Sequence, residues 1–126
     1  MNTLKILIAD DHDIVRTGMK ALMEDQPGWQ VVAEGGTGRQ AVDKARATAP
    51  DVCVLDVTMP ELDGLEATRE IRRMTAGGRG PRIVAMTANA QSSDREQCLE
   101  AGMDDYISKP FTFETLSAVV TKWARR

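Results

Sequence analysis

The sequence predicts an α/β fold, a single doubly wound domain with a parallel sheet of five strands. Short apolar runs alternate five times with helical patterns along the chain. The runs are continuous rather than alternating in polarity, which is typical of parallel strands buried on both faces. The 126 residues are the usual length of one domain. We therefore expect residues 1–126 to form one unit with right-handed crossovers.

The first two strands and helices lie before residue 51. Leu4–Ala9 is the first apolar run and Val31–Ala33 is the second. Pro27-Gly28 separates the first helix from the second strand, and Pro50 ends the second helix. Apolar residues recur at helical spacing in both helices. They are Val15, Gly18, Met19, Leu22 and Met23 in the first helix, and Ala41, Val42, Ala45 and Ala49 in the second.

The second half of the chain continues the alternation. Val52–Leu55 and Ile83–Met86 are the third and fourth apolar runs, and Tyr106–Ile107 is a shorter fifth. Helices are expected at about residues 65–74 and 93–100, and the last helix carries Leu116, Val119, Val120 and Trp123 on one face. The expected strand order is the flavodoxin-like 2-1-3-4-5, in which the loops after the first and third strands are neighbours.

The composition argues against several classes of protein. A net charge of -3 and a pI near 5.2 argue against direct nucleic-acid binding by this chain. The first residues lack a signal-peptide pattern, and no segment is long enough to span a membrane. We therefore expect a cytoplasmic protein without membrane contact.

The sulfur-containing residues are mostly assigned to the core. Two cysteines give no disulfide framework, and Cys53 lies in an apolar run, where it is expected to be a small buried residue. Methionines on apolar helix and strand positions are expected to fill the core. Met59 and Met103 fall in loops, where they could contact a partner.

Five polar residues follow the predicted strands: Asp10, Asp11, Asp56, Thr87 and Lys109. Ligands bind at the carboxyl ends of the strands in an open parallel sheet, so these side chains are expected to meet. Three carboxylates in a small space repel one another, and one lysine supplies too little positive charge. A hard cation such as Mg²⁺ would supply the rest. The pattern predicts a metal-assisted phosphoryl-transfer site.

Asp56 is the expected nucleophile, because a carboxylate can accept a phosphoryl group as an acyl phosphate. Mg²⁺ would bridge the acidic pair and the phosphoryl oxygens, with the backbone carbonyl of Thr58 completing its shell. Lys109 and Thr87 would each contact another phosphoryl oxygen. Ala88 is small and leaves room.

Each of these residues also has a purely structural interpretation. The pair Asp10-Asp11 alone could belong to a helix N-terminus, where carboxylates are favoured. Thr87 alone could be an ordinary strand residue. His12, the only histidine, is assigned to an exposed capping region rather than to a ligand or base. Their joint occurrence at successive strand ends favours function.

Three other functions were weighed. The glycine-containing segment 33–38 lacks the phosphate-loop pattern and is interpreted as a turn. A flavin site of the flavodoxin type would meet the acidic loop 10–13, which would repel the flavin phosphate. A hydrolase with an aspartate nucleophile needs an acid/base and a substrate cap, for which the chain has no spare length.

The chain resembles the receiver domains of two-component response regulators over nearly its whole length. The resemblance rests on Ile8–Asp11, Val54–Gly64, Ala85–Ala88 and Gly102–Phe111. It implies that a sensor histidine kinase or histidine phosphotransfer domain phosphorylates Asp56, with Mg²⁺ bound by Asp10, Asp11 and Asp56. It thus implies a phosphoacceptor switch that assists its own phosphorylation and dephosphorylation, not an enzyme with a separate substrate.

The resemblance also implies how the signal would be passed on. The bond between Lys109 and Pro110 would be cis and would aim the lysine. Thr87 and Tyr106 resemble the switch pair of the family, which changes the partner-binding face of the fourth helix, fifth strand and fifth helix. A binding-only pseudo-receiver, which is not phosphorylated, is the main alternative. A homodimer through that face is compatible with the sequence but not required by it.

The two halves of the chain suggest different outputs. Residues 8–16 resemble receivers that precede helix-turn-helix DNA-binding domains. The segments 86–90 and 109–111 resemble receivers of hybrid sensor kinases. The output domain, fused or separate, stays open at this point.

Overall fold

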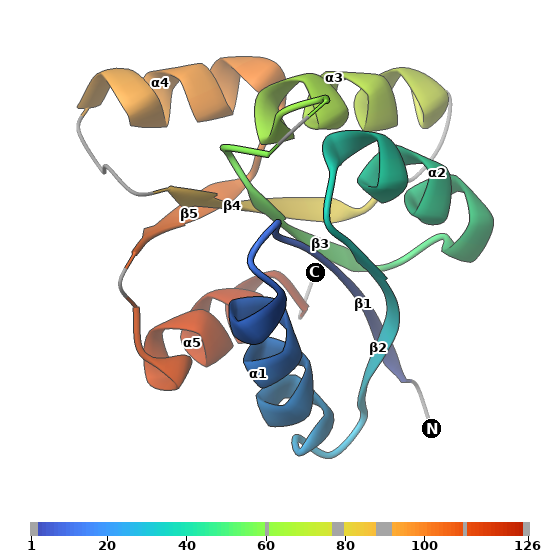
Figure 1. Ribbon diagram of the computed structural model, residues 1–126, viewed down its shortest axis with the longest axis vertical. Helices are drawn as coiled ribbons and strands as arrows, with labels where there is room; N and C mark the ends of the chain where they lie inside the picture. The colour runs from blue at the N-terminus through green and yellow to red at the C-terminus, as the bar shows by residue number, and fades with distance from the viewer. Residues whose placement is uncertain (1–2, 60, 77–79, 88–91, 110, 125–126) are drawn as a thin grey trace.

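The computed structural model describes residues 3–59, 61–76, 80–87, 92–109 and 111–124. Five parallel strands form one sheet in the order β2-β1-β3-β4-β5, which confirms the predicted topology (Figure 1). The strands are β1 (Leu4–Ala9), β2 (Trp29–Gly35), β3 (Val52–Asp56), β4 (Arg82–Thr87) and β5 (Asp105–Ser108). The helices are α1 (Asp13–Glu24), α2 (Gly38–Thr48), α3 (Gly64–Met74), α4 (Ser92–Ala101) and α5 (Phe113–Ala124).

Helices cover both faces of the sheet. Helices α1 and α5 lie on one face, and α2, α3 and α4 lie on the other (Figure 1). Successive residues of a strand point to opposite faces, so Ile6 and Ile8 join the core under α1 and α5, whereas Leu7 joins the other core. Every residue of β3 is buried. This explains why the apolar runs are continuous rather than alternating.

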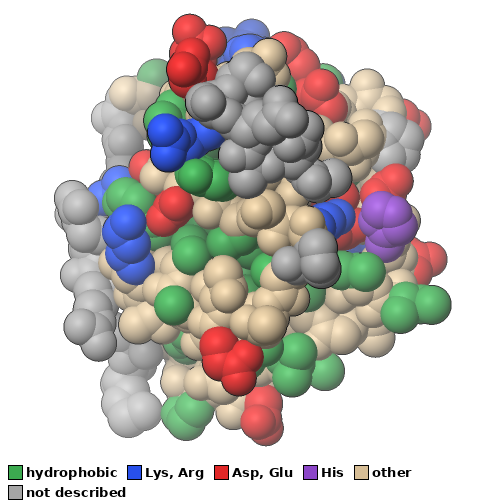
Figure 2. Space-filling view, turned by 90° about the vertical axis from the view of Figure 1, so that its left-hand side faces the viewer, with side chains coloured by type: hydrophobic (Ala, Val, Ile, Leu, Met, Phe, Trp, Pro, Cys, Tyr) green, Lys and Arg blue, Asp and Glu red, His purple; other side chains and the backbone are tan. Residues whose placement is uncertain are grey.

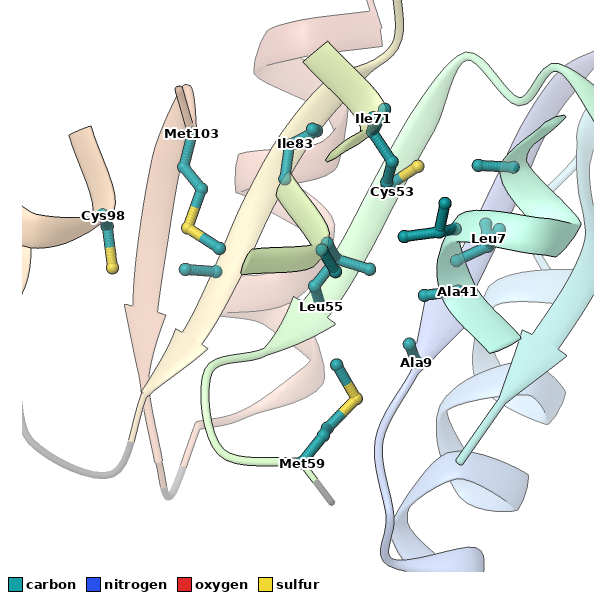
Figure 3. Packing of buried hydrophobic residues seen from close by; sticks show 14 residues of the cluster. Leu7, Ala9, Ala41, Cys53, Leu55, Met59, Ile71, Ile83, Cys98 and Met103 are labelled. Atoms are coloured by element: carbon teal, nitrogen blue, oxygen red, sulfur yellow. The ribbon is translucent and has the colours of Figure 1, made fainter. Parts of the chain in front are cut away.

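The core under α2, α3 and α4 includes Met59 and Met103, for which the sequence left a partner contact open. Met59 is 7% exposed and Met103 is 4% exposed, so both methionines are core residues instead. Both lie in loops whose side chains turn back onto the sheet, where Met59 reaches toward Ala9 and Leu55 (Figure 3). The flexible thioether side chain fills such irregular gaps at the end of a sheet.

The buried apolar face of α1 is narrower than the one predicted from the spacing of its apolar residues. Met19 and Met23 are buried under the sheet. Val15 and Leu22 are 41% and 48% exposed, and Ile14 is 89% exposed. The helix therefore carries an apolar outer surface as well as its buried stripe.

Local chemistry sets where several helices begin and end. The side chain of Thr37 accepts a hydrogen bond from the N–H of Gln40 and caps α2. Asp63 caps α3 in the same way through the N–H of Glu66. Gly102 follows α4 with a φ of +106°, a left-handed conformation that favours glycine.

Two glycines allow close backbone packing near the carboxyl edge of the sheet. A Cβ on Gly38 would lie 1.7 Å from the carbonyl oxygen of Leu62, and one on Gly64 would lie 2.3 Å from that of Asp56. The segment 33–38 was interpreted as a turn, but it contains the end of β2 and the first residue of α2, and only residues 36–37 connect them. Its Gly38 packs against the loop before α3.

Arg72 ties α3 to the segments before β4 and β5. Its guanidinium donates to the carbonyl oxygens of Gly102 at 2.9 Å and Pro81 at 2.7 Å, and to the carboxylate of Asp104 at 2.8 Å. Asp104 also accepts a hydrogen bond from the N–H of Ile83 at 2.8 Å. Arg72 is therefore a structural residue rather than part of a solvated face.

Among the described residues, no helix is both long enough and apolar enough to cross a lipid bilayer.

Candidate functional site

The topology brings the ends of four strands to one edge of the sheet. Ala9 at the end of β1 pairs with Leu55, and Asp56 at the end of β3 pairs with Met86. The N–H of Lys109 donates to the carbonyl oxygen of Thr87 at 2.7 Å, which places the residue after β5 beside the end of β4. The predicted polar residues therefore share one edge because each follows its strand in the same register.

Lys109 joins two of the carboxylates. Its Nζ lies 2.9 Å from Oδ2 of Asp56 and 3.2 Å from Oδ2 of Asp10. The Asp10 side chain is fully buried and that of Asp56 is 6% exposed. Burying an ionised carboxylate is costly unless it is paired, so the ammonium of Lys109 offsets part of the cost of burying both carboxylates.

The site holds more negative charge than this lysine neutralises. One ligand atom from each of Asp10, Asp11, His12 and Asp56 lies within 4.8 Å of the others. Two carboxylates at that separation repel by about 3.5 kcal/mol at an effective dielectric of about 20. Oxygen ligands of this kind fit a hard divalent cation such as Mg²⁺. The donor set is therefore compatible with the metal that the sequence predicts.

His12 contacts both residues of the acidic pair, which the sequence did not predict. Its Nδ1 lies 2.8 Å from Oδ1 of Asp10 and 3.2 Å from Oδ1 of Asp11. Its side chain is 63% exposed and it is the N-cap residue of α1, as expected, although its side chain makes no capping hydrogen bond. Figure 2 shows acidic side chains gathered beside the histidine on this part of the surface.

The buried charges shift the pKa of one another. Burial raises the pKa of Asp56, and the hydrogen bond from Lys109 offsets part of that effect. Burial also opposes ionisation of Asp10, but hydrogen bonds from His12 and Lys109 outweigh it and lower the pKa of Asp10. Burial would lower the pKa of Lys109, but Asp56 and Asp10 raise it. The hydrogen bond to Asp10 raises the pKa of His12.

Arg16 holds the loop that carries the acidic pair, and sequence reasoning gave it no role. Its guanidinium donates to the carbonyl oxygen of Asp10 at 2.6 Å and to the carboxylate of Asp13 at 2.7 Å. It also contacts Glu34, near the end of β2, at 3.3 Å. An arginine three residues after an Asp-Asp-His-Asp loop, on the same helical turn, is the signal that could have indicated this role.

The other predicted site residues are placed differently. The N–H of Thr58 donates to Oδ1 of Asp56 at 3.1 Å, whereas its proposed role as a carbonyl ligand stays a prediction. Thr87 is buried at the same edge, 6% exposed. Ala88 and Pro110 lie outside the described residues. Tyr106 is partly buried, and its predicted switch role stays a prediction.

Arg95 of α4 lies against Tyr106. Its guanidinium is 3.5 Å from the tyrosine hydroxyl and 6.0 Å from the ring centroid. This contact links α4 to β5 on the face that the sequence assigned to partner binding.

Comparison with known proteins gives a consistent result. The family model for the response regulator receiver domain matches residues 6–121. The response regulator protein VraR of Staphylococcus aureus is 34% identical over 125 residues. That match covers 98% of this chain but 57% of VraR, so the chain spans little more than half the length of this relative.

Solved structures share the fold. A LuxR-family two-component response regulator from Aurantimonas has a TM-score of 0.86 and 36% identity, covering 99% of this chain and 88% of that one. The receiver domain of a sensor histidine kinase from Pseudomonas aeruginosa has a TM-score of 0.85 and 38% identity, covering 98% and 99%. That structure has a magnesium ion coordinated in its active site cleft.

Proposed function

The chain belongs to the response regulator receiver domain family, and on that premise we propose that it accepts a phosphoryl group on Asp56 in a Mg²⁺-dependent reaction. One observation carries the proposal. Lys109 lies between the Asp56 and Asp10 carboxylates, at 2.9 and 3.2 Å, within a cluster that needs a further cation. This arrangement keeps a nucleophile, a metal-binding carboxylate and a fixed positive charge together.

The reaction transfers a phosphoryl group between two nucleophiles. A carboxylate oxygen of Asp56 attacks the phosphorus of a phosphohistidine, the phosphorus–nitrogen bond breaks, and the histidine nitrogen leaves and takes up a proton. The donor is a sensor histidine kinase or a histidine phosphotransfer domain. A bound Mg²⁺ would be held by Asp10, Asp11, Asp56 and the carbonyl oxygen of Thr58, and would supply positive charge to neutralise the phosphoryl oxygens.

The protein side chains position and neutralise the transferred group. Lys109 is already held by its contacts with both buried carboxylates, so its ammonium can move from an Asp56 oxygen to a phosphoryl oxygen with little reorganisation. Thr87 is the last residue of β4, where its hydroxyl can reach another phosphoryl oxygen. The N–H of Thr58 keeps one oxygen of Asp56 oriented at 3.1 Å.

The output is a change of the partner-binding face. Thr87 moves toward the phosphoryl group and Tyr106 turns inward, so the face of α4, β5 and α5 changes its partners. The output domain is fused or separate. The chain itself could also form a homodimer through this face. We place the chain in the cytoplasm, in contact with a kinase or phosphotransfer domain rather than with nucleic acid or membrane.

Intact mass spectrometry after incubation with acetyl phosphate tests the proposal. We expect one phosphoryl group per chain in the presence of Mg²⁺, and none when the metal is chelated. Asp56→Asn should abolish the gain, whereas Asp43→Asn, which removes an exposed carboxylate on α2, should not. A well-folded chain that gains no phosphoryl group would instead be a binding-only pseudo-receiver.

A further inference from the structure

The only histidine of the chain lies where another metal ligand would lie. Nδ1 of His12 is 2.8 Å from Oδ1 of Asp10 and 3.2 Å from Oδ1 of Asp11. Ligands at adjacent positions of an octahedral ion, each about 2.1 Å from it, are about 3.0 Å apart. The ring nitrogen and the two carboxylate oxygens therefore have the spacing of three ligands to one ion.

A backbone hydrogen bond holds the main chain of His12 beside the acidic pair. The N–H of His12 donates to Oδ1 of Asp10 at 2.8 Å, so the residue is held directly beside the buried carboxylate. One ligand atom from each of Asp10, Asp11, His12 and Asp56 lies within 4.8 Å of the others. Opposite ligands of an octahedral ion are about 4.2 Å apart, so a small inward shift brings all four within range.

We propose that His12 is an additional ligand in this site, and that through its imidazole a divalent transition metal such as Ni²⁺ competes with Mg²⁺. This inference rests on the proposed function. Imidazole nitrogen is a preferred ligand of Ni²⁺, Zn²⁺ and Cu²⁺, whereas Mg²⁺ prefers oxygen. Nδ1 offers its lone pair to the ion once the proton of its hydrogen bond to Asp10 has passed to solvent, and the ring keeps its other proton on Nε2. The carboxylates serve both metals, and the histidine discriminates between them.

A purely positioning role for His12 makes a different prediction. A ring that only orients the Asp10 carboxylate by a hydrogen bond would help every cation that this carboxylate binds. Its removal would then weaken Mg²⁺ and Ni²⁺ binding by similar factors. A ligand role weakens Ni²⁺ selectively, because only Ni²⁺ gains from the imidazole.

Titration calorimetry on the chain purified without a polyhistidine tag separates these roles. In His12→Gln we expect Ni²⁺ affinity to fall at least about tenfold, while Mg²⁺ affinity changes less than about threefold. The Asp43→Asn control should change neither. Equal weakening of both metals, or no weakening of Ni²⁺ binding, would overturn the inference.

The ring signals give a second measurement, because the chain has one histidine and its NMR assignment is therefore unambiguous. We expect sub-stoichiometric Ni²⁺ to broaden the ring protons and Mg²⁺ to leave them sharp. Ring protons that stay sharp at saturating Ni²⁺ would also overturn the inference. An unmodified chain that binds Ni²⁺ through His12 but gains no phosphoryl group with Mg²⁺ would contradict only the proposed function.

Discussion

Replacing Asp56 by asparagine is expected to stabilise the metal-free fold. At an effective dielectric of about 20, the attraction of Asp56 to Lys109 at 2.9 Å is about 6 kcal/mol. Repulsion from Asp10, within 4.8 Å, is at least about 3.5 kcal/mol, and the more exposed Asp11 adds a smaller, solvent-screened part. The attraction therefore exceeds the repulsion by at most about 2 kcal/mol. The burial cost, which is the largest cause of the raised pKa of Asp56, then decides the sign.

Urea unfolding with and without Mg²⁺ measures both effects. Without the metal, we expect Asp56→Asn to raise the free energy of unfolding by about 1–2 kcal/mol. With Mg²⁺ at about one hundred times its dissociation constant, the unmodified chain should gain about 2.7 kcal/mol, and the variant less than about 1 kcal/mol. The control Asp43→Asn should follow the unmodified chain. A less stable metal-free variant, or an equal Mg²⁺ gain in both chains, would refute the reasoning.

The pH dependence of this difference has a defined sign. Because the pKa of Asp56 is raised by folding, the folded state keeps its proton to higher pH than the unfolded state. Its contribution to stability is complete below the ordinary carboxyl pKa and is lost as pH rises through the folded pKa. The stability gap between Asp56→Asn and the unmodified chain should therefore be largest near neutral pH and should close in acid.

Three further substitutions and one labelling experiment test other parts of the structure. Arg16→Gln removes a 2.6 Å hydrogen bond to the carbonyl oxygen of Asp10, so Mg²⁺ affinity measured by calorimetry should fall about threefold to tenfold. An unchanged affinity would contradict the role of Arg16 in holding the acidic loop. Arg72→Met leaves two carbonyls and a carboxylate without this donor, and should lower the free energy of unfolding in urea by about 2–4 kcal/mol; a loss below about 1 kcal/mol would argue against it. Gly64→Ala should cost at least about 2 kcal/mol in the same assay, because its Cβ would lie 2.3 Å from a carbonyl oxygen of β3; a neutral result would show that the loop can move freely. Burial raises the pKa of Cys53 to about 12, so about one thiol in ten thousand is ionised at pH 8. Iodoacetamide should therefore label this cysteine in urea but not in the native chain. Rapid labelling of the native chain would mean that the core opens.

The sequence predicted the sheet well because its strands are buried on both faces. Leu4–Ala9 has the predicted bounds, and β3 differs by one residue. The second strand is longer than the predicted Val31–Ala33, because it is an edge strand and its polar Gln30 and Glu34 interrupt the apolar pattern. A strand paired on one side only needs no continuous apolar run to form.

The candidate site was predictable in part. Asp10, Asp56 and Lys109 meet because each follows a strand, and strand ends can be read from apolar runs and topology. The contacts of Arg16 and His12 were not predictable in the same way, since they depend on the path of one loop and the orientation of side chains. Periodicity says which side of a helix a residue occupies, but not which atoms it reaches.

The loop residues show the same limit. Met59 and Met103 follow regular elements at positions that look exposed in sequence, yet both are buried. Arg72 lies among several arginines on α3, and only its three contacts distinguish it from a solvated side chain. Such differences arise from tertiary packing, which has no local sequence pattern.

Chemical trapping of the phosphorylated residue tests the central claim most directly. The chain is incubated with acetyl phosphate and Mg²⁺ and then treated with borohydride, which reduces an acyl phosphate of aspartate to homoserine. Peptide mass mapping should find homoserine at position 56 alone, and only when Mg²⁺ is present. Homoserine at another aspartate, or none in a chain that remains folded, would contradict the assignment of Asp56 as the phosphoryl acceptor.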